Sequence, residues 1–200
     1  MRRTTKWGWT LALVLGTMAG TVRADDGKTP TTPEEITRAM EAAAKPGLEH
    51  EKLKPLAGTW TYTCKMWMEP VGEPIVTKGQ IEREWILGGR FLSEKVRGTG
   101  FDGQPGFEGF GLLGYDNNLK KYTQTFACTM GTGTSTGQGV ATKTGTLTFE
   151  TECACPLSEE KIKGRDVVRI VSDNKIVTES YKKIQGEEVK VMEIVAVRKK

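Results

Sequence analysis

The chain has 200 residues, with 29 Lys or Arg against 25 Asp or Glu and a formal net charge of +4 at pH 7. All four charged residues among the first 24 are basic, namely Arg2, Arg3, Lys6 and Arg23, so the remainder holds 29 − 4 = 25 basic and 25 acidic residues. A surface without excess positive charge attracts phosphate backbones weakly, so nucleic acid is not an expected partner. The 200 − 24 = 176 residues that follow fit one domain with a sizeable core.

Residues 1–24 have the features of an export signal. Arg2, Arg3 and Lys6 precede an apolar stretch over 7–22, and Val22-Arg23-Ala24 offers a cleavage site. The residues that should follow a twin arginine are absent and no cysteine lies at the cleavage site, so general secretion without a lipid anchor is favoured. The apolar stretch is too short and too interrupted by Gly and Thr for a good membrane span, and no later segment approaches the ~20 apolar residues that a membrane-spanning helix needs. The sequence therefore predicts a periplasmic or secreted protein without a membrane span.

A flexible linker over 25–32 and a single domain over 33–200 are expected next, because 25–32 is polar and lacks periodicity. Thr32 and Glu35 have the spacing of a capping box, and Pro33 suits the first helical position. The apolar residues that follow share one helical face: Ile36, Ala39, Met40 and Ala43. We expect a short amphipathic helix that ends at Lys45-Pro46-Gly47, and a further helical turn within 49–56.

From Gly58 onward the apolar residues alternate with polar ones, as in a β-strand. The first such face carries Trp60, Tyr62, Cys64, Met66 and Met68. Further strands are predicted over 75–87, 90–99, 107–115, 120–130, 134–142, 145–153, 162–171, 175–184 and 188–198, separated by turn residues such as Gly88-Gly89, Asp116-Asn117-Asn118, Ser172-Asp173-Asn174 and Gln185-Gly186-Glu187. The pattern predicts an all-β protein with a single antiparallel up-and-down barrel of about ten strands. A two-sheet sandwich remains the alternative.

Four charged residues lie on otherwise apolar strand faces, where an ion is costly unless it is paired or meets a ligand. They are Arg83 between Ile81 and Trp85, Glu94 between Leu92 and Val96, Glu179 between Val177 and Tyr181, and Glu193 between Val191 and Val195. Together they suggest an internal ionic cluster that orients a polar head group, with aromatic walls from Trp85, Tyr115 and Tyr181. Two alternatives stay open: some strands face the other way and leave these charges in water, or the charges form a buried pairing that is purely structural.

His50 is the only histidine, which excludes a Ser-His-Asp triad or a multi-histidine metal site anywhere else. In Glu49-His50-Glu51, exposure or a helix-capping role is favoured over catalysis. Paired carboxylates for acid and base chemistry remain available in Glu94, Glu179 and Glu193, but their spacing selects no reaction. We therefore name no catalytic residue.

Cys64, Cys128, Cys153 and Cys155 are the four cysteines of a chain expected to be exported. Disulfides are permitted there, and all three pairings remain open. Cys153-Ala154-Cys155 lacks evident third and fourth soft ligands, so no metal is predicted. Cys64 alternates with core residues and suits a buried thiol.

Several motifs occur together in a fixed order: Lys45-Pro46-Gly47-Leu48-Glu49-His50 with Leu53, Leu56-Ala57-Gly58-Thr59-Trp60, Glu84-Trp85-Ile86-Leu87-Gly88-Gly89-Arg90-Phe91-Leu92, Gly114-Tyr115-Asp116 and Met192-Glu193-Ile194. In this combination the chain resembles, over roughly 45–200, a bacterial family known only as a domain of unknown function, whose members look lipocalin-like. The resemblance implies a calycin-type barrel and no particular activity.

The lipocalin resemblance also implies a structural contact between Trp60 on the first strand and Arg198 on the last, with the cation packed over the indole. Arg198 and Glu193 lie on opposite faces of a regular strand, so both point inward only if a bulge intervenes. Haem-binding barrels called nitrobindins begin with a similar Trp motif, but a late histidine holds their iron. No histidine follows His50, so no cofactor is predicted.

Three functions are consistent with this sequence. The first, which we favour, is an exported barrel that binds a small, partly apolar molecule through Arg83, Glu94, Glu179 and Glu193. The second is an enzyme of the same fold that uses an interior carboxylate, which requires an open cavity and a shifted carboxyl pKa. The third is an envelope interaction module that uses the Thr/Gly-rich strands over 129–144. The sequence leaves the ligand and the oligomeric state open.

Overall fold

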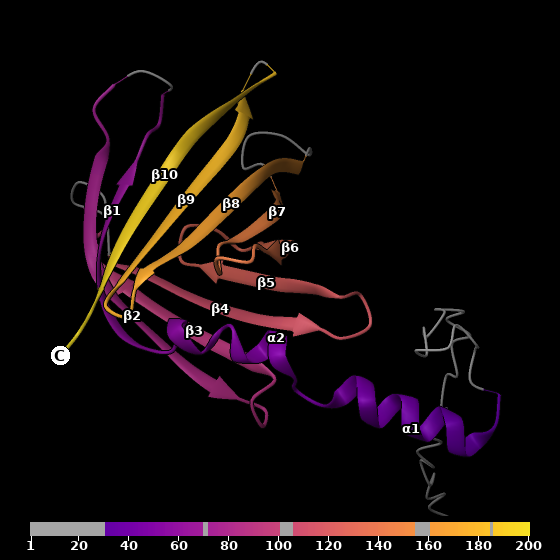
Figure 1. Ribbon diagram of the computed structural model, residues 1–200. Coiled ribbons are helices and arrows are strands. Elements are labelled where there is room, and N and C mark those ends of the chain that lie inside the picture. Colours follow the sequence, from indigo (N-terminus) through magenta and orange to yellow (C-terminus); the bar gives the residue numbers. More distant parts are fainter. Residues whose placement is uncertain (1–30, 70–71, 101–105, 155–160, 185) are drawn as a thin grey trace, which may run out of the picture. The chain divides into compact units, whose positions relative to one another are not determined.

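Ten antiparallel strands close into a single up-and-down barrel in the computed structural model, which describes residues 31–69, 72–100, 106–154, 161–184 and 186–200 (Figure 1). The expected signal over 1–24 and residues 25–30 of the expected linker lie outside the described residues. The strands are β1 (Gly58–Met66), β2 (Ile75–Ile86), β3 (Phe91–Gly98), β4 (Phe107–Asp116), β5 (Lys121–Cys128), β6 (Thr134–Ala141), β7 (Leu147–Ala154), β8 (Lys161–Ser172), β9 (Lys175–Ile184) and β10 (Glu187–Arg198). The predicted all-β barrel is confirmed.

Pairing between the first and last strands closes the sheet. Trp60 on β1 lies opposite Arg198 on β10, and Met66 lies opposite Met192. Every strand therefore has two hydrogen-bonded neighbours, and no edge strand is left open. This closure distinguishes the barrel from the alternative two-sheet sandwich, whose two sheets would each end in edge strands.

Helix α1 (Pro33–Ala44) begins where the capping pattern predicted. The backbone N–H of Glu35 donates to Thr32 Oγ1 over 3.2 Å, and the N–H of Thr32 donates to Glu35 Oε2 over 3.1 Å. This reciprocal pair satisfies two of the N–H groups that a helix start leaves without partners. None of the residues of α1 is buried.

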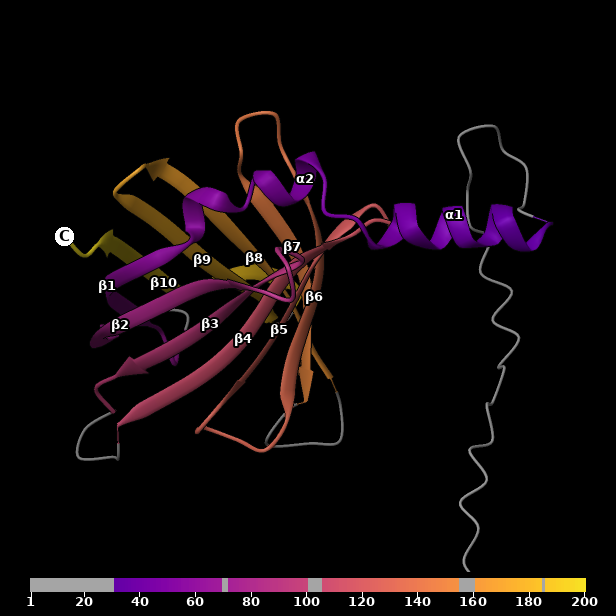
Figure 2. The ribbon, with the colours of Figure 1, turned by 90° about the horizontal axis from the view of Figure 1, so that it is seen from below.

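Helix α2 (Leu48–Glu51) and a 3₁₀ turn, η1 (Lys54–Leu56), form the predicted turns before the barrel and cover one of its ends (Figure 2). Leu53 and Leu56 are fully buried and pack in the same core cluster as Trp60. The indole N–H of Trp60 donates to the carbonyl of Leu56 over 3.0 Å. We call this end of the barrel the capped end, and the opposite end the rim.

Arg198 fastens the capped end to the barrel. Its guanidinium carbon lies 4.1 Å from the centroid of the Trp60 ring, which is the contact that the lipocalin resemblance implies. Its Nε, Nη1 and Nη2 atoms donate to the carbonyls of Asp173, Ala57 and Pro55 over 2.7, 2.8 and 2.9 Å. One side chain thus joins β1, β10, the β8–β9 turn and the segment before β1.

His50 is buried within the capped end, so the expectation of a capping role holds and exposure does not. The backbone N–H of Gly47 donates to His50 Nδ1 over 3.1 Å at the start of α2. The ring of His50 also meets that of Tyr115 edge-on, with centroids 5.9 Å apart. Burial lowers the pKa of His50, so the ring is neutral at pH 7.

A bulge between Lys190 and Met192 sets the faces of β10. It lies on the rim side of Glu193, so the strand is regular from Met192 to Arg198. Met192 and Ile194 consequently line the interior, whereas Glu193 lies on the outer face. Of Arg198 and Glu193, only Arg198 therefore lies on the inner face of β10, because alternation along a regular strand places the two side chains on opposite faces.

Candidate functional site

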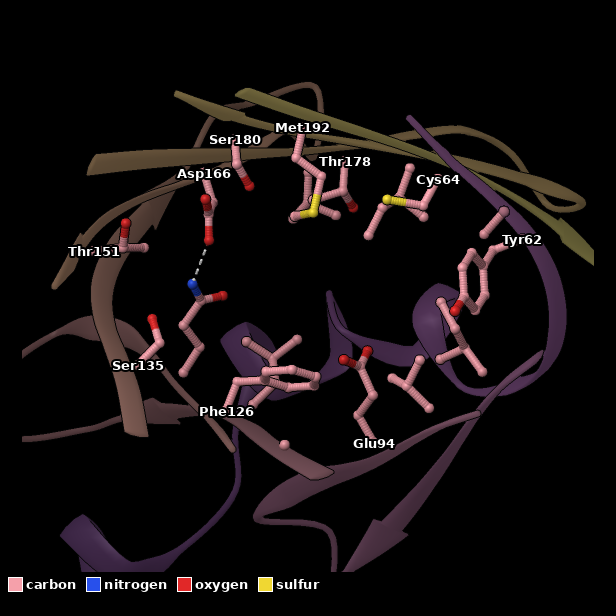
Figure 3. A pocket seen from close by; sticks show the side chains of 18 of the residues that line it. Tyr62, Cys64, Glu94, Phe126, Ser135, Thr151, Asp166, Thr178, Ser180 and Met192 are labelled. Atoms are coloured by element: carbon pink, nitrogen blue, oxygen red, sulfur yellow. Dashed lines mark hydrogen bonds between the residues drawn. The ribbon is translucent and has the colours of Figure 1, made fainter. Parts of the chain in front are cut away.

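The interior of the barrel holds a cavity of about 470 Å³. Its lining runs from Leu56 at the capped end to Trp67, Met68 and Met130, which follow the rim ends of β1 and β5. Most of the wall is apolar, with side chains from Ile81, Leu92, Phe126, Val168, Ile176, Met192 and Ile194. Figure 3 shows the labelled lining residues arranged round an open centre. Such a volume and lining are typical of sites for small ligands.

One side of the cavity is polar. Gln124 on β5 donates its side-chain N–H to Asp166 Oδ2 on β8 over 2.9 Å, the dashed line of Figure 3. Ser180 on β9 lies directly opposite Asp166 in the sheet, and Thr151 and Ser135 lie on the same side of the cavity. We call Gln124, Ser135, Thr151, Asp166 and Ser180 the polar wall.

The bond from Gln124 to Asp166 spans β6 and β7, and Gly137 on β6 makes the crossing possible. A Cβ added at Gly137 would lie 3.0 Å from Gln124 Cγ and 3.1 Å from both Gln124 Nε2 and Thr151 Cγ2. A side chain at this position would therefore crowd the two neighbours that form the polar wall.

An ion pair forms the second polar feature of the cavity. Arg83 Nε on β2 donates to Glu94 Oε2 on β3 over 2.5 Å, and the two side chains are only 11% and 23% exposed. The pair is formed by cross-strand neighbours whose backbones lie side by side. Burial of both charges is compensated by their mutual attraction and hydrogen bond.

Two buried side-chain polar atoms among the described residues have no hydrogen-bond partner, and both belong to residues that line the cavity. They are Arg83 Nη1 and Thr151 Oγ1. Buried polar atoms are rarely left without partners, and each one costs about 1–3 kcal/mol. Both of the unpartnered side-chain atoms found among the described residues thus lie on the wall of the cavity.

Only two of the seven residues predicted to bind a ligand line this cavity, namely Arg83 and Glu94. Trp85 is half-buried and packs against the core without lining the cavity. Tyr115 faces the capped end, where it contacts His50 and meets the ring of Tyr122 edge-on at 5.0 Å. Trp85 and Tyr115 therefore both pack against the buried core cluster instead of lining the cavity.

The other three predicted residues, Glu179, Tyr181 and Glu193, lie on the outer face of the barrel, so a single internal ionic cluster is wrong. On β9 the inward residues are Ile176, Thr178, Ser180 and Lys182. Glu179 alternates with these and points away from the cavity. The outer face around Glu179 and Glu193 contains both apolar and charged side chains. The sequence pattern does not distinguish such an outer face from an inner face.

Glu179 is nevertheless buried, because neighbouring side chains on the outer face cover it. It accepts hydrogen bonds from Arg169, from Tyr181 over 3.1 Å and from Lys190 over 3.3 Å. Lys190 also donates to Glu193 over 2.8 Å. Burial raises the pKa of Glu179, but these hydrogen bonds outweigh it and hold the pKa below its usual value. The pKa of Lys190 is raised, chiefly by its hydrogen bond to Glu193.

Sequence reasoning missed the polar wall. Asp166 lies between Gly164 and Val168 on the inner face of β8, whereas Arg165 and Arg169 occupy the outer face. Because β8 carries charged residues on both of its faces, its sequence does not show which face points into the barrel. The placement of Asp166 beside both Ser180 and Gln124 depends on the register of five strands, β5 to β9, which no local pattern supplies.

Cys64, Cys128 and Cys153 carry free thiols, and Cys155 lies outside the described residues. Cys64 is buried and lines the cavity. Burial raises the pKa of its thiol, while a hydrogen bond with Thr77 acts in the opposite direction. The thiol is therefore protonated at pH 7, as expected of a cysteine that packs like a small apolar residue.

Within the described ranges, no group of three or more His, Cys, Asp or Glu side chains is arranged to hold a metal ion. In that same part of the chain, no helix has the length and apolar character needed to cross a membrane.

A comparison with solved structures finds a redesigned β-barrel, described as b11L5F_LGL, that is 15% identical and has a TM-score of 0.41. The match covers 74% of this chain and 96% of the redesigned barrel. No curated protein matches the chain. A family model described as a protein of unknown function (DUF1579) matches residues 45–198, which include α2, η1 and all ten strands. The chain therefore belongs to the DUF1579 family.

Proposed function

We propose that this protein is an exported barrel that binds one small, largely apolar molecule with a polar head group inside the cavity. The observation that carries this proposal is the cavity itself, which has a volume of about 470 Å³ and mostly apolar walls. Ligand sites of this kind commonly measure roughly 300–1,000 Å³ and combine apolar walls with a few polar groups.

The polar groups of the interior support a head group on the ligand. Asp166 and Gln124 lie on one side of the cavity, and the Arg83–Glu94 pair lies on β2 and β3. A fully apolar ligand would displace water from these polar groups without offering hydrogen bonds in return, which is unfavourable in free energy. Arg83 and Glu94 therefore remain candidate contacts, while Trp85, Tyr115, Glu179, Tyr181 and Glu193 are not part of the proposed site.

Export is supported by the amino-terminal sequence. Basic residues, an apolar stretch and a cleavage site follow one another within residues 1–24. The proposal places the mature protein in the periplasm or outside the cell.

A binding role is favoured over an enzymatic one by the positions of the acid and base groups. Glu94 is paired with Arg83, and His50, the only histidine, accepts a backbone hydrogen bond in the capped end. Neither is free to exchange protons with a molecule in the cavity. Asp166, the remaining carboxylate of the cavity wall, is hydrogen-bonded to the neutral amide of Gln124 rather than to a second acid or base.

The test is a titration with N-phenyl-1-naphthylamine, a neutral apolar dye whose fluorescence rises in an apolar environment. We expect saturable binding of one dye per barrel. A double variant, Thr178→Trp with Ser135→Phe, fills the cavity from two sides and should weaken binding at least ~tenfold, which corresponds to about 1.4 kcal/mol.

The matched control places the same side chains on the outer face of the same strands. Val177→Trp with Thr136→Phe substitutes the neighbours of Thr178 and Ser135, and Thr136 is exposed. This control should bind the dye within about twofold of the natural chain. Equal loss in both double variants, or no saturable binding by the natural chain, would overturn the proposal. Circular dichroism of each variant verifies that the barrel is folded.

A further inference from the structure

We infer that the cavity selects a ligand whose head group is a cation rich in hydrogen-bond donors, such as a primary ammonium, and that Asp166 recognises it. This inference rests on the proposed function and specifies the chemistry of its ligand. It derives from the charges and acceptors of the polar wall rather than from the volume of the cavity.

Asp166 is a carboxylate that lines the cavity and has no cationic partner among the residues that the structure describes. Its one hydrogen bond within the described part of the chain comes from the neutral amide of Gln124, over 2.9 Å. None of the ion pairs between described residues includes Asp166. A carboxylate in a mostly apolar interior is destabilised unless an opposite charge approaches it.

The other charges of the cavity do not supply that partner. Arg83 is held by Glu94, which leaves the pair neutral. Lys182 also lines the cavity, one inward position nearer the rim than Ser180, and it forms no ion pair with a described residue. By contrast, Glu179 on the outer face of the same strand is held by two cations, Arg169 and Lys190.

The hydrogen-bonding groups of the polar wall fit a donor. Gln124 uses its N–H toward Asp166, so its carbonyl oxygen remains an acceptor beside the two oxygens of the carboxylate. Ser180 adds a hydroxyl directly opposite Asp166 in the sheet. An ammonium has three donors and no acceptor, and its hydrogen bonds to a carboxylate are the strong, charge-assisted kind.

The surroundings of Asp166 provide for an apolar body attached to this head group. Phe149, which is fully buried, lies opposite Asp166 on β7, and Val168 is the next inward residue toward the capped end. Figure 3 shows the carboxylate of Asp166 facing the same open centre as Phe126 and Met192. The arrangement suits an alkyl or aryl amine whose charged end lies at the polar wall.

Displacement of bound N-phenyl-1-naphthylamine tests this inference with three molecules of equal chain length: 1-dodecylamine, 1-dodecanol and dodecanoate, each below its aggregation concentration at pH 7. The amine is protonated under these conditions. We expect it to displace the dye at an about tenfold lower concentration than 1-dodecanol, and dodecanoate to be the weakest. Asp166→Asn should remove the advantage of the amine over the alcohol, whereas Glu150→Gln, exposed on the outer face of β7, should preserve it.

The outcomes separate the two proposals. If the alcohol and the carboxylate displace the dye as well as the amine does, or if Asp166→Asn keeps the preference, the inference is wrong and the binding function stands. A preference for dodecanoate would also contradict it and would point to Arg83 or Lys182. If the natural chain does not bind the dye and none of the three molecules binds, the proposed function fails and the inference falls with it.

Discussion

The capped end and the cavity wall belong to the same barrel but differ in how completely their polar side chains are hydrogen-bonded. At the capped end, the indole of Trp60 and three nitrogen atoms of Arg198 each donate to a backbone carbonyl. Along the cavity, Thr151 Oγ1 and Arg83 Nη1 have no hydrogen-bond partner in the described part of the chain, and the one hydrogen-bond partner of Asp166 there is a neutral amide. The contrast indicates that the capped end stabilises the fold, while the cavity retains unsatisfied groups at a cost in stability, as binding sites often do.

The largest expected effect is at the capped end. Trp60→Ala should lower the free energy of unfolding by about 4 kcal/mol, because it leaves a cavity under Leu56 and removes the ring beneath Arg198. Urea unfolding followed by circular dichroism measures it. Val197→Ala, at an exposed position of β10, should change the same quantity by less than about 0.5 kcal/mol. A loss below about 2 kcal/mol for Trp60→Ala would show that the capped end is not the stabilising region.

Arg198→Lys should lower the free energy of unfolding by about 2 kcal/mol, although the charge is kept. A lysine has one nitrogen and cannot donate to the carbonyls of Pro55, Ala57 and Asp173 together. The control is Arg97→Lys, since Arg97 is 72% exposed and its ion pair with Glu108 spans 3.8 Å. Such a surface pair contributes about 0–1 kcal/mol, so the control should change the free energy of unfolding very little. Equal effects of the two substitutions would contradict the role given to Arg198.

A smaller and pH-dependent effect is expected at Glu179 on the outer face. Burial raises its pKa, but hydrogen bonds from Arg169, Lys190 and Tyr181 outweigh burial, so the folded pKa lies below the ordinary value of 4.5. A lowered folded pKa stabilises the fold above the unfolded pKa, and this stabilisation disappears as the pH falls through the folded pKa. Glu179→Gln should therefore cost about 2 kcal/mol at pH 7 and progressively less below pH 4.5.

The measurement for Glu179 is urea unfolding at several pH values between neutral and acid. Glu150→Gln, exposed on the outer face of β7, serves as the matched carboxylate and should change stability by less than about 0.5 kcal/mol throughout. A cost for Glu179→Gln that stays constant down to strong acid would contradict the assignment of its hydrogen bonds.

The smallest effect has the opposite sign and lies in the cavity. Thr151→Val should raise the free energy of unfolding of the ligand-free protein by about 1 kcal/mol, because it replaces a buried hydroxyl that has no partner. Thr148→Val, three residues earlier on the outer face of β7, should stay within about 0.5 kcal/mol of the natural chain. Destabilisation by Thr151→Val would mean that the hydroxyl is satisfied and that the cavity wall resembles the capped end after all.

Much of the barrel was predictable from the sequence, because alternation and turn residues are local signals. The face of β1 with Trp60, Tyr62 and Cys64, the capping box at Thr32 and the ten strands all follow from neighbours along the chain. The family resemblance added the contact between Trp60 and Arg198, which local patterns do not give.

The site was predicted only in part, because it depends on which face of each strand turns inward. Arg83 and Glu94 are cross-strand partners whose neighbours on the same face, such as Ile81 and Leu92, are apolar, and they line the cavity as expected. Glu179 has apolar neighbours as well, yet its face is the outer one, where Arg169 and Lys190 cover it. Asp166 meets Gln124 only across two intervening strands, a contact set by the closure of the whole sheet.

Binding of a molecule inside the barrel is the central requirement of the proposed function, and methyl NMR tests it directly. The methyl groups of Ile176 and Ile194 line the cavity, whereas those of Val140 and Val197 are exposed on the outside. Titration of methyl-labelled protein with N-phenyl-1-naphthylamine should shift the signals of Ile176 and Ile194 and leave those of Val140 and Val197 in place. Shifts confined to Val140 and Val197, or no shifts at saturating dye, would contradict a binding site within the barrel.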